Sequence, residues 1–153
     1  MEILEYLQLP EPEKALAYLA GCEWSAGRFL AKLIKSGTLE EKMGEGARVF
    51  FLMNGSEVVT FATYSRKDAI ADDALYPWIG FVYTDARYRG HRYSQQIIDH
   101  ALAMARAQGH ERVYLTSNHI GLYEKYGFVY LENRVDVWGE DSRIYFYPIK
   151  TMA

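Results

Sequence analysis

Between Val82 and Gly109 the chain reads V-Y-T-D-A-R-Y-R-G-H-R-Y-S-Q-Q-I-I-D-H-A-L-A-M-A-R-A-Q-G, and the rest of the sequence is arranged around this stretch. It continues an apolar, aromatic segment, Trp78–Tyr83, which predicts a β-strand. A short basic loop follows, and then a segment whose apolar residues recur with the spacing of one helix face: Ile97, Ile98, Ala101, Leu102 and Ala105. A helix begins with unpaired N–H groups and the positive end of its dipole. A strand, a tight loop and a helix start together therefore indicate an anion site.

The loop concentrates positive charge in a chain whose net charge is −3. Its basic side chains are Arg87, Arg89, His91 and Arg92. We interpret this cluster at a helix start as a cradle for a diphosphate. The alternative is a solvated surface loop, which is what most short charged segments between a strand and a helix are.

Length and composition predict one globular domain over residues 1–153, because 50% of the residues are hydrophobic and 24% are charged. The slightly negative net charge argues against general nucleic-acid binding. A single cysteine, Cys22, excludes an intrachain disulfide and fits a reducing compartment. With no charged-then-apolar leader and no apolar run of bilayer length, we expect a cytoplasmic protein that does not interact with membranes.

The first half of the chain predicts a strand, three helical segments and a hairpin. The hairpin signal is Asn54-Gly55 between two apolar runs, a dipeptide that favours a two-residue turn. The expected elements are a strand at Ile3–Leu7, helices at Pro12–Leu19 and Ser25–Lys35, a helical turn at Thr38–Met43, and hairpin strands at Arg48–Met53 and Glu57–Tyr64.

The second half predicts a mixed sheet, because the Trp78–Tyr83 strand, the long helix and a strand at Arg112–Thr116 form a strand–helix–strand unit with parallel strands. A polar loop, Ser65–Ala74, precedes this unit. After it we expect a short helix at Ile120–Tyr126 and strands at Phe128–Trp138 and Arg143–Tyr147. The fold class is therefore α+β with a mixed sheet.

Two segments carry a family resemblance. Tyr88 followed by Arg89-Gly90-His91-Arg92-Tyr93-Ser94 resembles the acetyl-CoA loop of the GNAT superfamily of N-acyltransferases, Arg/Gln-x-x-Gly-x-Gly/Ala. Here Arg92 replaces the middle glycine and Ser94 the last small residue. About thirty residues later, Gly121-Leu122-Tyr123-Glu124-Lys125-Tyr126-Gly127-Phe128 resembles the second GNAT signature, (Leu/Phe)-Tyr-x-Lys-x-Gly-Phe. Two signatures in this order are far more specific than either alone.

The resemblance implies a mostly antiparallel sheet of about seven strands, flanked by helices and splayed open between its fourth and fifth strands. The pantetheine arm of acetyl-CoA, the implied cosubstrate, would lie in that opening. The implied cofactor contacts are the backbone of a bulged fourth strand at Phe81, Val82, Tyr83 and Thr84, the loop and helix start at Arg89, Gly90, His91, Arg92, Tyr93 and Ser94, and the outer-arm and thiol contacts Asn118 and Tyr123.

The implied reaction is attack of a neutral amine on the thioester carbonyl in a ternary complex. Tyr123 is the implied acid for the departing thiolate, and packing alone is the alternative role for its ring. Many family members carry a glutamate on the fourth strand, but this strand offers no carboxylate. The candidate bases are Asp72, Asp73 and His119.

Other chemistry has little support in the sequence. Cys22 has no neighbouring His or Asp pattern, which argues against a covalent acyl-enzyme, and the scattered histidines have no metal-ligand spacing. The expected partner is a small-molecule amine or a peptide, and we leave open whether the chain forms a homodimer. Two alternatives remain: a CoA-binding regulatory module without turnover, and a nucleotide-binding domain, which would leave the second signature unexplained.

Overall fold

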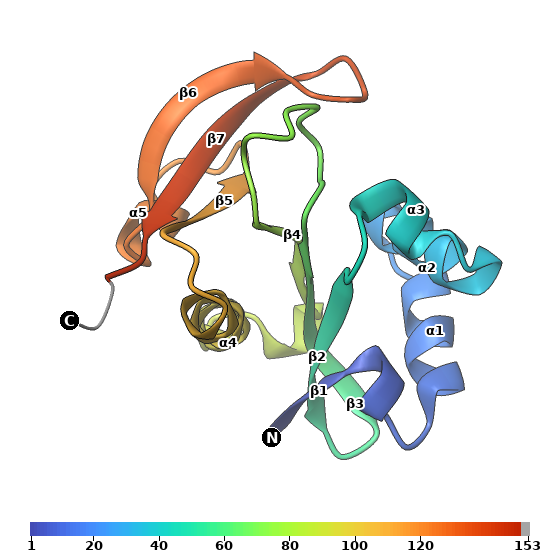
Figure 1. Ribbon diagram of the computed structural model, residues 1–153. Coiled ribbons are helices and arrows are strands. Elements are labelled where there is room, and N and C mark those ends of the chain that lie inside the picture. The colour runs from blue at the N-terminus through green and yellow to red at the C-terminus, as the bar shows by residue number, and fades with distance from the viewer. Residues whose placement is uncertain (151–153) are drawn as a thin grey trace.

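The computed structural model of the chain describes residues 1–150, so residues 151–153 of the expected domain lie outside the described residues. Its strands form one seven-stranded sheet in the order β1-β2-β3-β4-β5-β7-β6 (Figure 1). Neighbouring strands are antiparallel except β4 and β5, which confirms the expected mixed sheet. The strands are β1 Glu2–Glu5, β2 Arg48–Asn54, β3 Glu57–Ser65, β4 Trp78–Thr84, β5 Arg112–Thr116, β6 Val129–Val135 and β7 Asp141–Pro148.

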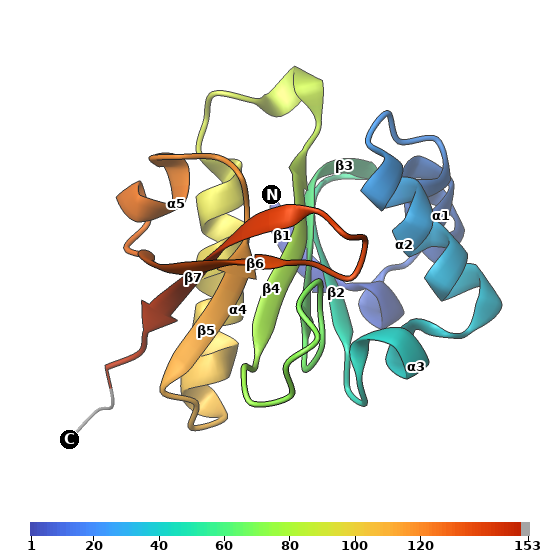
Figure 2. The same cartoon turned by 90° about the horizontal axis from the view of Figure 1, so that it is seen from above.

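Helices cover both faces of the β1–β4 part of the sheet, with α4 on one face and α1, α2 and α3 on the other (Figures 1 and 2). This arrangement explains why β3 is buried at every position after its first residue, without the alternation of a half-exposed strand. The helical segments are η1 Tyr6–Gln8, α1 Pro12–Ala20, α2 Ser25–Ser36, α3 Leu39–Met43, η2 Ala86–Tyr88, α4 Tyr93–Ala107 and α5 Leu122–Lys125. Within residues 1–150, none of the helices is long and apolar enough to cross a membrane.

Each face has its own core. The predicted apolar face of α4 is buried in full and packs with Ile79 of β4 and Val113 and Leu115 of β5. On the other face, Leu19 of α1 and Leu30 of α2 pack with side chains of β2 and β3. The sheet between them is therefore held on both sides, which fixes the position of β4.

Several element ends differ from the sequence prediction. The first strand ends at Glu5 instead of Leu7, because the Gln8 side chain accepts a hydrogen bond from the Glu5 N–H (3.0 Å) and turns the chain into η1. The expected strand at Phe128–Trp138 ends at Val135. Beyond it, Asp136 accepts hydrogen bonds from the N–H groups of Trp138 (2.9 Å) and Glu140 (3.0 Å), which makes a turn.

The short helix is also shorter than the expected Ile120–Tyr126. Gly121, with φ +96°, stands immediately before α5, and α5 spans only Leu122–Lys125. Tyr126 and Gly127 then lead into β6, with Gly127 at φ +97°. The glycines at both ends therefore limit the helix to one turn.

Candidate active site

The pairing of β4 with β5 is limited to one position. Trp78 stands opposite Tyr114, and the Tyr114 N–H donates to the Pro77 carbonyl (2.9 Å). Beyond this point β5, β7 and β6 run obliquely away from β4 (Figure 1). The later residues of β4, up to Thr84, therefore have no register partner in β5, and the sheet is open along this line.

A bulge lies in β4 directly beside the opening. Phe61 of β3 faces Tyr83 and Thr63 faces Gly80, so that Phe81 and Val82 together stand opposite one residue of β3. Phe81 has φ +50°, which is uncommon for a bulky residue and costs about 1–2 kcal/mol. The bulge that the resemblance implies is present, and its backbone borders the open side of β4.

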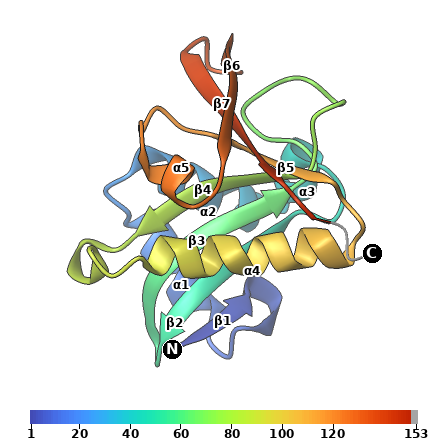
Figure 3. The ribbon, with the colours of Figure 1, turned by 90° about the vertical axis from the view of Figure 1, so that its left-hand side faces the viewer.

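The basic loop begins at the end of β4 (Figure 3). Asp85 is the first residue after β4. Its side chain accepts hydrogen bonds from the N–H (2.9 Å) and Nε (3.0 Å) of Arg87 and from the Tyr18 hydroxyl (2.7 Å). Arg87 also pairs with Glu57 (3.4 Å). Arg87 therefore holds the loop in place through Asp85 and Glu57.

The other basic residues of the loop are exposed. Arg89 donates from Nε to the Thr84 carbonyl (3.1 Å), and its guanidinium lies 5.4 Å from the ring centroid of Tyr83. Gly90 has φ +89°, and a Cβ at this position would meet no atom within 4 Å. Arg92 adopts the left-handed conformation, φ +57°, immediately before α4. The residue that replaces the family's glycine thus has a backbone conformation that favours glycine.

A hydrogen bond joins the two signature segments. The Ser94 hydroxyl, in the first turn of α4, lies 2.9 Å from the Tyr126 hydroxyl just after α5. Tyr123 of α5 is 6% exposed and packs edge-on against Tyr126 and Phe128. Burial raises the pKa of Tyr123 to about 12, so its phenol stays protonated at neutral pH.

The remaining predicted residues differ in their surroundings. Asn118 and His119 are exposed. The backbone of His119 is held by the Ser117 hydroxyl (3.0 Å) and the Tyr145 hydroxyl (3.1 Å), but its ring makes no hydrogen bond among residues 1–150. The structure thus fixes this loop through its main chain.

The two acidic candidates of the β3–β4 loop are in different states. Asp72 accepts a hydrogen bond from Arg134 of β6 (2.7 Å), and this contact holds the pKa of Asp72 below its usual value. Asp73 is exposed. A third carboxylate of the same loop, Asp68, lies against Gly80 of β4, and the sequence prediction missed it because nothing in the sequence distinguishes Asp68 from the other acids nearby.

Aromatic rings surround the bulge on the face that α1 and α2 cover. Trp24 stacks on Tyr83 at a centroid distance of 5.7 Å, and Phe29 stacks on Phe81 at 6.4 Å. Trp138 of the β6–β7 loop meets Phe29 edge-on at 6.3 Å and is 57% exposed. The surface formed by Trp24, Phe29, Phe81 and Trp138, here called the aromatic surface, brings together rings from segments far apart in the sequence.

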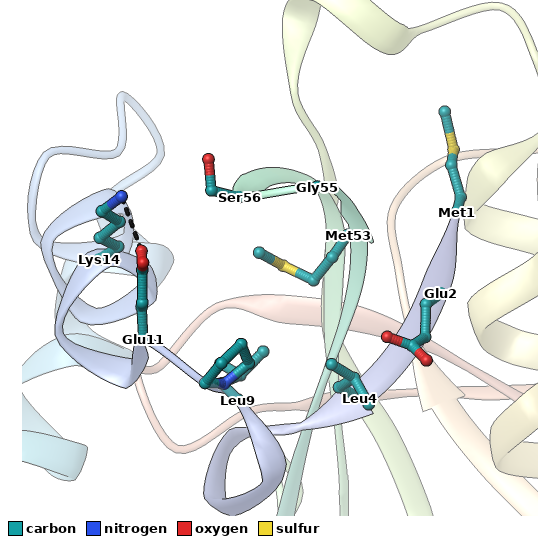
Figure 4. A pocket seen from close by; sticks show the side chains of 10 residues that line it. Met1, Glu2, Leu4, Leu9, Glu11, Lys14, Met53, Gly55 and Ser56 are labelled. Atoms are coloured by element: carbon teal, nitrogen blue, oxygen red, sulfur yellow. Dashed lines mark ion pairs between the residues drawn. The ribbon is translucent and has the colours of Figure 1, made fainter.

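One cavity belongs to another part of the molecule. A cavity of about 400 Å³ lies between β1, the start of α1 and the β2–β3 turn, and the Glu11–Lys14 ion pair (2.6 Å) stands at its edge (Figure 4). A smaller cavity, of about 290 Å³, lies between α1 and the end of β4, lined in part by Tyr18, Tyr83 and Asp85. Of these two cavities, the smaller one is lined by residues at the end of β4. Within residues 1–150 no group of His, Cys, Asp and Glu side chains could hold a metal ion.

The model of the acetyltransferase (GNAT) family matches residues 7–128, which is most of the chain. The chain belongs to the GNAT acetyltransferase family. The GNAT match includes both signature segments and ends at Phe128, before β6. It also begins within the N-terminal region, where the sequence alone supports only the general layout. No curated protein sequence matches the chain in a similarity search.

Solved structures share the GNAT fold over nearly the whole chain. An aminoglycoside 6'-N-acetyltransferase complexed with coenzyme A has a TM-score of 0.72 at 14% identity, and the match covers 100% of this chain and 99% of that one. An acetyltransferase from Streptococcus agalactiae has a TM-score of 0.67 at 20% identity, covering 97% and 98%. A GNAT acetyltransferase from Elizabethkingia anophelis with acetyl-CoA bound has a TM-score of 0.64 at 11% identity, covering 97% of each chain. At these identities the likeness establishes the fold.

Proposed function

We propose that this protein transfers an acetyl group from acetyl-CoA to a primary amine of a small molecule or peptide, by direct attack in a ternary complex. The observation that carries the proposal is the state of β4. It loses its β5 partner after Trp78 and bulges at Phe81–Val82, directly before the basic loop and the start of α4. Such a strand offers backbone hydrogen-bonding groups to an extended ligand that lies along its open side.

The loop from Arg89 to Ser94 supports binding of the diphosphate. Gly90 leaves open space where a side chain would stand, and the first amides of α4 have no partner within the helix. Arg89, His91 and Arg92 are exposed and add positive charge beside these amides. The thioester would then lie beside the bulge at Phe81–Thr84, with Asn118 and Tyr123 beyond it.

Two groups support the chemistry on the donor side. Backbone N–H groups of the bulge would stabilise the negative charge that develops on the thioester oxygen. Tyr123 would give its proton to the leaving thiolate, a role that suits a phenol kept protonated by burial. An acceptor amine would approach over the aromatic surface, where rings can hold a cation or an apolar group.

The test is release of free CoA thiol from acetyl-CoA across a panel of amines, with polyamines, aminoglycosides and short peptides as separate arms. The proposal predicts acceptor-dependent thiol release and an N-acetylated product by mass spectrometry. Acetyl-CoA binding without release for any acceptor would contradict it.

That contradicting result would favour the alternative, a CoA-binding regulatory module. The observation behind the alternative is Arg92, which places a side chain where the family has a glycine and holds a strained φ of +57°. A protein that only binds CoA would still show a raised melting temperature with CoA and acetyl-CoA.

A further inference from the structure

One carboxylate of the β3–β4 loop is turned inward. Asp68 reaches the surface in part, but its Oδ2 is sealed from solvent and has no hydrogen-bond partner among the described residues. Its Oδ1 accepts one hydrogen bond, from the N–H of Ala69 (2.7 Å). Burial raises the pKa of Asp68 to about 7, against the opposing effect of the Ala69 hydrogen bond. A buried carboxylate oxygen without a partner destabilises the fold, and such an exception to the usual pairing of buried polar atoms points to a functional role.

Gly80 of β4 makes room for this carboxylate. The backbone of Gly80 is outside the left-handed region, so any residue could adopt it. A Cβ at position 80, however, would overlap Asp68 Oδ2 and lie 3.0 Å from its Cγ. The Asp68 carboxylate thus occupies the space of a β4 side chain, in the strand where the sequence offers no acid of its own.

The carboxylate lies on the face of the aromatic surface. Ile79 packs with α4, and successive residues of a regular strand point to opposite faces, so position 80 points toward the α1–α2 side. The bulge at Phe81–Val82 interrupts this alternation, which puts Phe81 on the same side as position 80. The next residue, Phe81, contacts Trp24 and Phe29 on that side. The β6–β7 loop is tied to the same place, because the Val137 N–H donates to the Ala69 carbonyl (2.8 Å).

Charged groups of the neighbouring segments have other contacts. Arg66, in the same loop, lies over the ring of Tyr76 at 4.1 Å, and Arg134 of β6 pairs with Asp72. Arg28 of α2 donates to the carbonyls of Cys22 (2.6 Å) and Glu23 (2.9 Å), and Lys67 is exposed. Within residues 1–150, Asp68 therefore has no ion-pair partner.

We propose that Asp68 is the general base that takes the proton from the acceptor ammonium, an inference that rests on the proposed acetyl transfer. The ammonium gives one proton to the Asp68 carboxylate, directly or through one water. The neutral amine then forms the C–N bond at the thioester carbonyl, and the C–S bond breaks with its electron pair on sulfur. Tyr123 gives its proton to the thiolate. The tyrosinate then takes up the second proton that the nitrogen must lose, which restores the phenol. Asp68 releases its proton to solvent, which balances the reaction.

The decisive variant is Asp68→Asn, which keeps the shape of the side chain and removes its titration. We expect kcat at pH 8 to fall by about 10²–10⁴-fold, with the Kd for acetyl-CoA unchanged. The acid limb of wild-type kcat/KM, with a midpoint near neutral pH, should disappear. In its place, activity of the variant should keep rising with pH until the amine loses its proton unaided. Glu45→Gln, at an exposed carboxylate between α3 and β2, is the matched control and should leave both the rate and the profile unchanged.

A second test places the carboxylate on β4 itself, and it works even if Asp68→Asn does not fold. Asp68→Ala should be slow for the same reason, and adding Gly80→Asp fills the vacated space with a carboxylate on β4. Recovery of at least about tenfold over Asp68→Ala would support the proposal, since a tenfold change corresponds to about 1.4 kcal/mol of the barrier.

The outcomes separate the inference from the proposed function. If the wild-type protein transfers acetyl groups and folded Asp68→Asn keeps its rate and pH profile, the assignment of Asp68 is wrong and the function stands. Loss of the acid limb in Asp72→Asn or Asp73→Asn, but not in Asp68→Asn, would likewise move the base. If Asp68→Asn does not fold, a folded double variant no faster than Asp68→Ala overturns the assignment. If the wild-type protein transfers to no amine, both fall together.

Discussion

At the scale of single residues, the candidate active site contains residues held in states that are costly in an ordinary core. Within residues 1–150, Asp68 Oδ2 is buried without a hydrogen-bond partner, and Phe81 and Arg92 adopt positive φ. Each state lowers the stability of the fold by an amount of the order of 1 kcal/mol or more. They gather on β4 and on the loops that precede and follow it.

The raised pKa of Asp68 makes a prediction about stability. The folded-state pKa of about 7 lies above the unfolded value of about 3.9, so the stability that this group contributes is present below pH 4 and is lost as the pH rises to 7. An asparagine at position 68 does not ionise, so Asp68→Asn avoids this loss, which amounts to up to a few kcal/mol in the free energy of unfolding. We compare the melting temperature of Asp68→Asn with that of wild type at two pH values. The difference should favour the variant by several degrees more at pH 8 than at pH 4. An equal difference at both pH values, measured by thermal unfolding, would show that Asp68 does not titrate in this range.

Tyr123 makes a prediction about turnover. Tyr123→Phe keeps the packing against Tyr126 and Phe128 and removes only the proton donor. We expect kcat to fall by about 10²-fold, while the Kd for acetyl-CoA stays within about twofold of wild type. Equal losses of turnover and of acetyl-CoA affinity would assign the ring to packing. Tyr130→Phe, at an exposed tyrosine of β6, is a suitable control.

At the scale of elements, each segment of the site depends on a neighbour that fixes it. The loop before α4 is held by Asp85 and Arg87, and α5 is joined to α4 through Tyr126 and Ser94. The β6–β7 loop is anchored at Ala69 of the β3–β4 loop. These contacts hold in place the segments on which we propose that the acetyl donor and the acceptor amine bind.

The start of α4 predicts how charge changes act on cofactor binding. Arg89→Glu should weaken binding of CoA by about 10–100-fold, the effect of one or two charge-assisted hydrogen bonds of about 1.5–3 kcal/mol. The same variant should leave binding of a phosphate-free pantetheine thioester nearly unchanged. Arg106→Glu, at the opposite end of the same helix, is the matched control. Isothermal titration with both ligands measures the difference, and equal weakening of the two would remove Arg89 from the phosphate site.

The β6–β7 loop predicts an effect on the acceptor alone. Trp138→Ala removes an exposed ring from the aromatic surface, and we expect KM for the acceptor amine to rise by about 5–30-fold, equivalent to about 1–2 kcal/mol. KM for acetyl-CoA should not change. Trp138→Phe should retain most of the affinity for the acceptor. A rise in KM for acetyl-CoA instead would place this loop on the donor side.

At the scale of the whole molecule, the sheet works as two parts joined at one register position, Trp78 opposite Tyr114. Helices on both faces hold the β1–β4 part, and β5, β7 and β6 form the other part (Figure 1). Along the chain, the first signature segment follows β4 and the second follows β5, the two strands that border the opening. A ligand that occupies the opening contacts both parts and should stabilise the native state as a unit.

The sequence predicted the elements well where the local signal is strong and the burial regular. Asn54-Gly55 located the hairpin, and the apolar stripe from Ile97 to Ala105 located α4 on the sheet. Element ends were missed where side chains redirect the chain, as Gln8 and Asp136 do. Asp68 was missed for a different reason. Its role depends on burial and on contact with Gly80, twelve positions away, and neither leaves a pattern in the sequence.

The most direct test is the crystal structure of the protein with acetyl-CoA. We predict that the pantetheine arm lies between β4 and β5, with its thioester beside the Phe81–Val82 bulge and its diphosphate on the amides from Arg89 to Ser94. The Tyr123 hydroxyl should lie within hydrogen-bond distance of the sulfur. Acetyl-CoA bound elsewhere, for example in the cavity between β1 and α1, with the β4–β5 opening unchanged, would contradict the account.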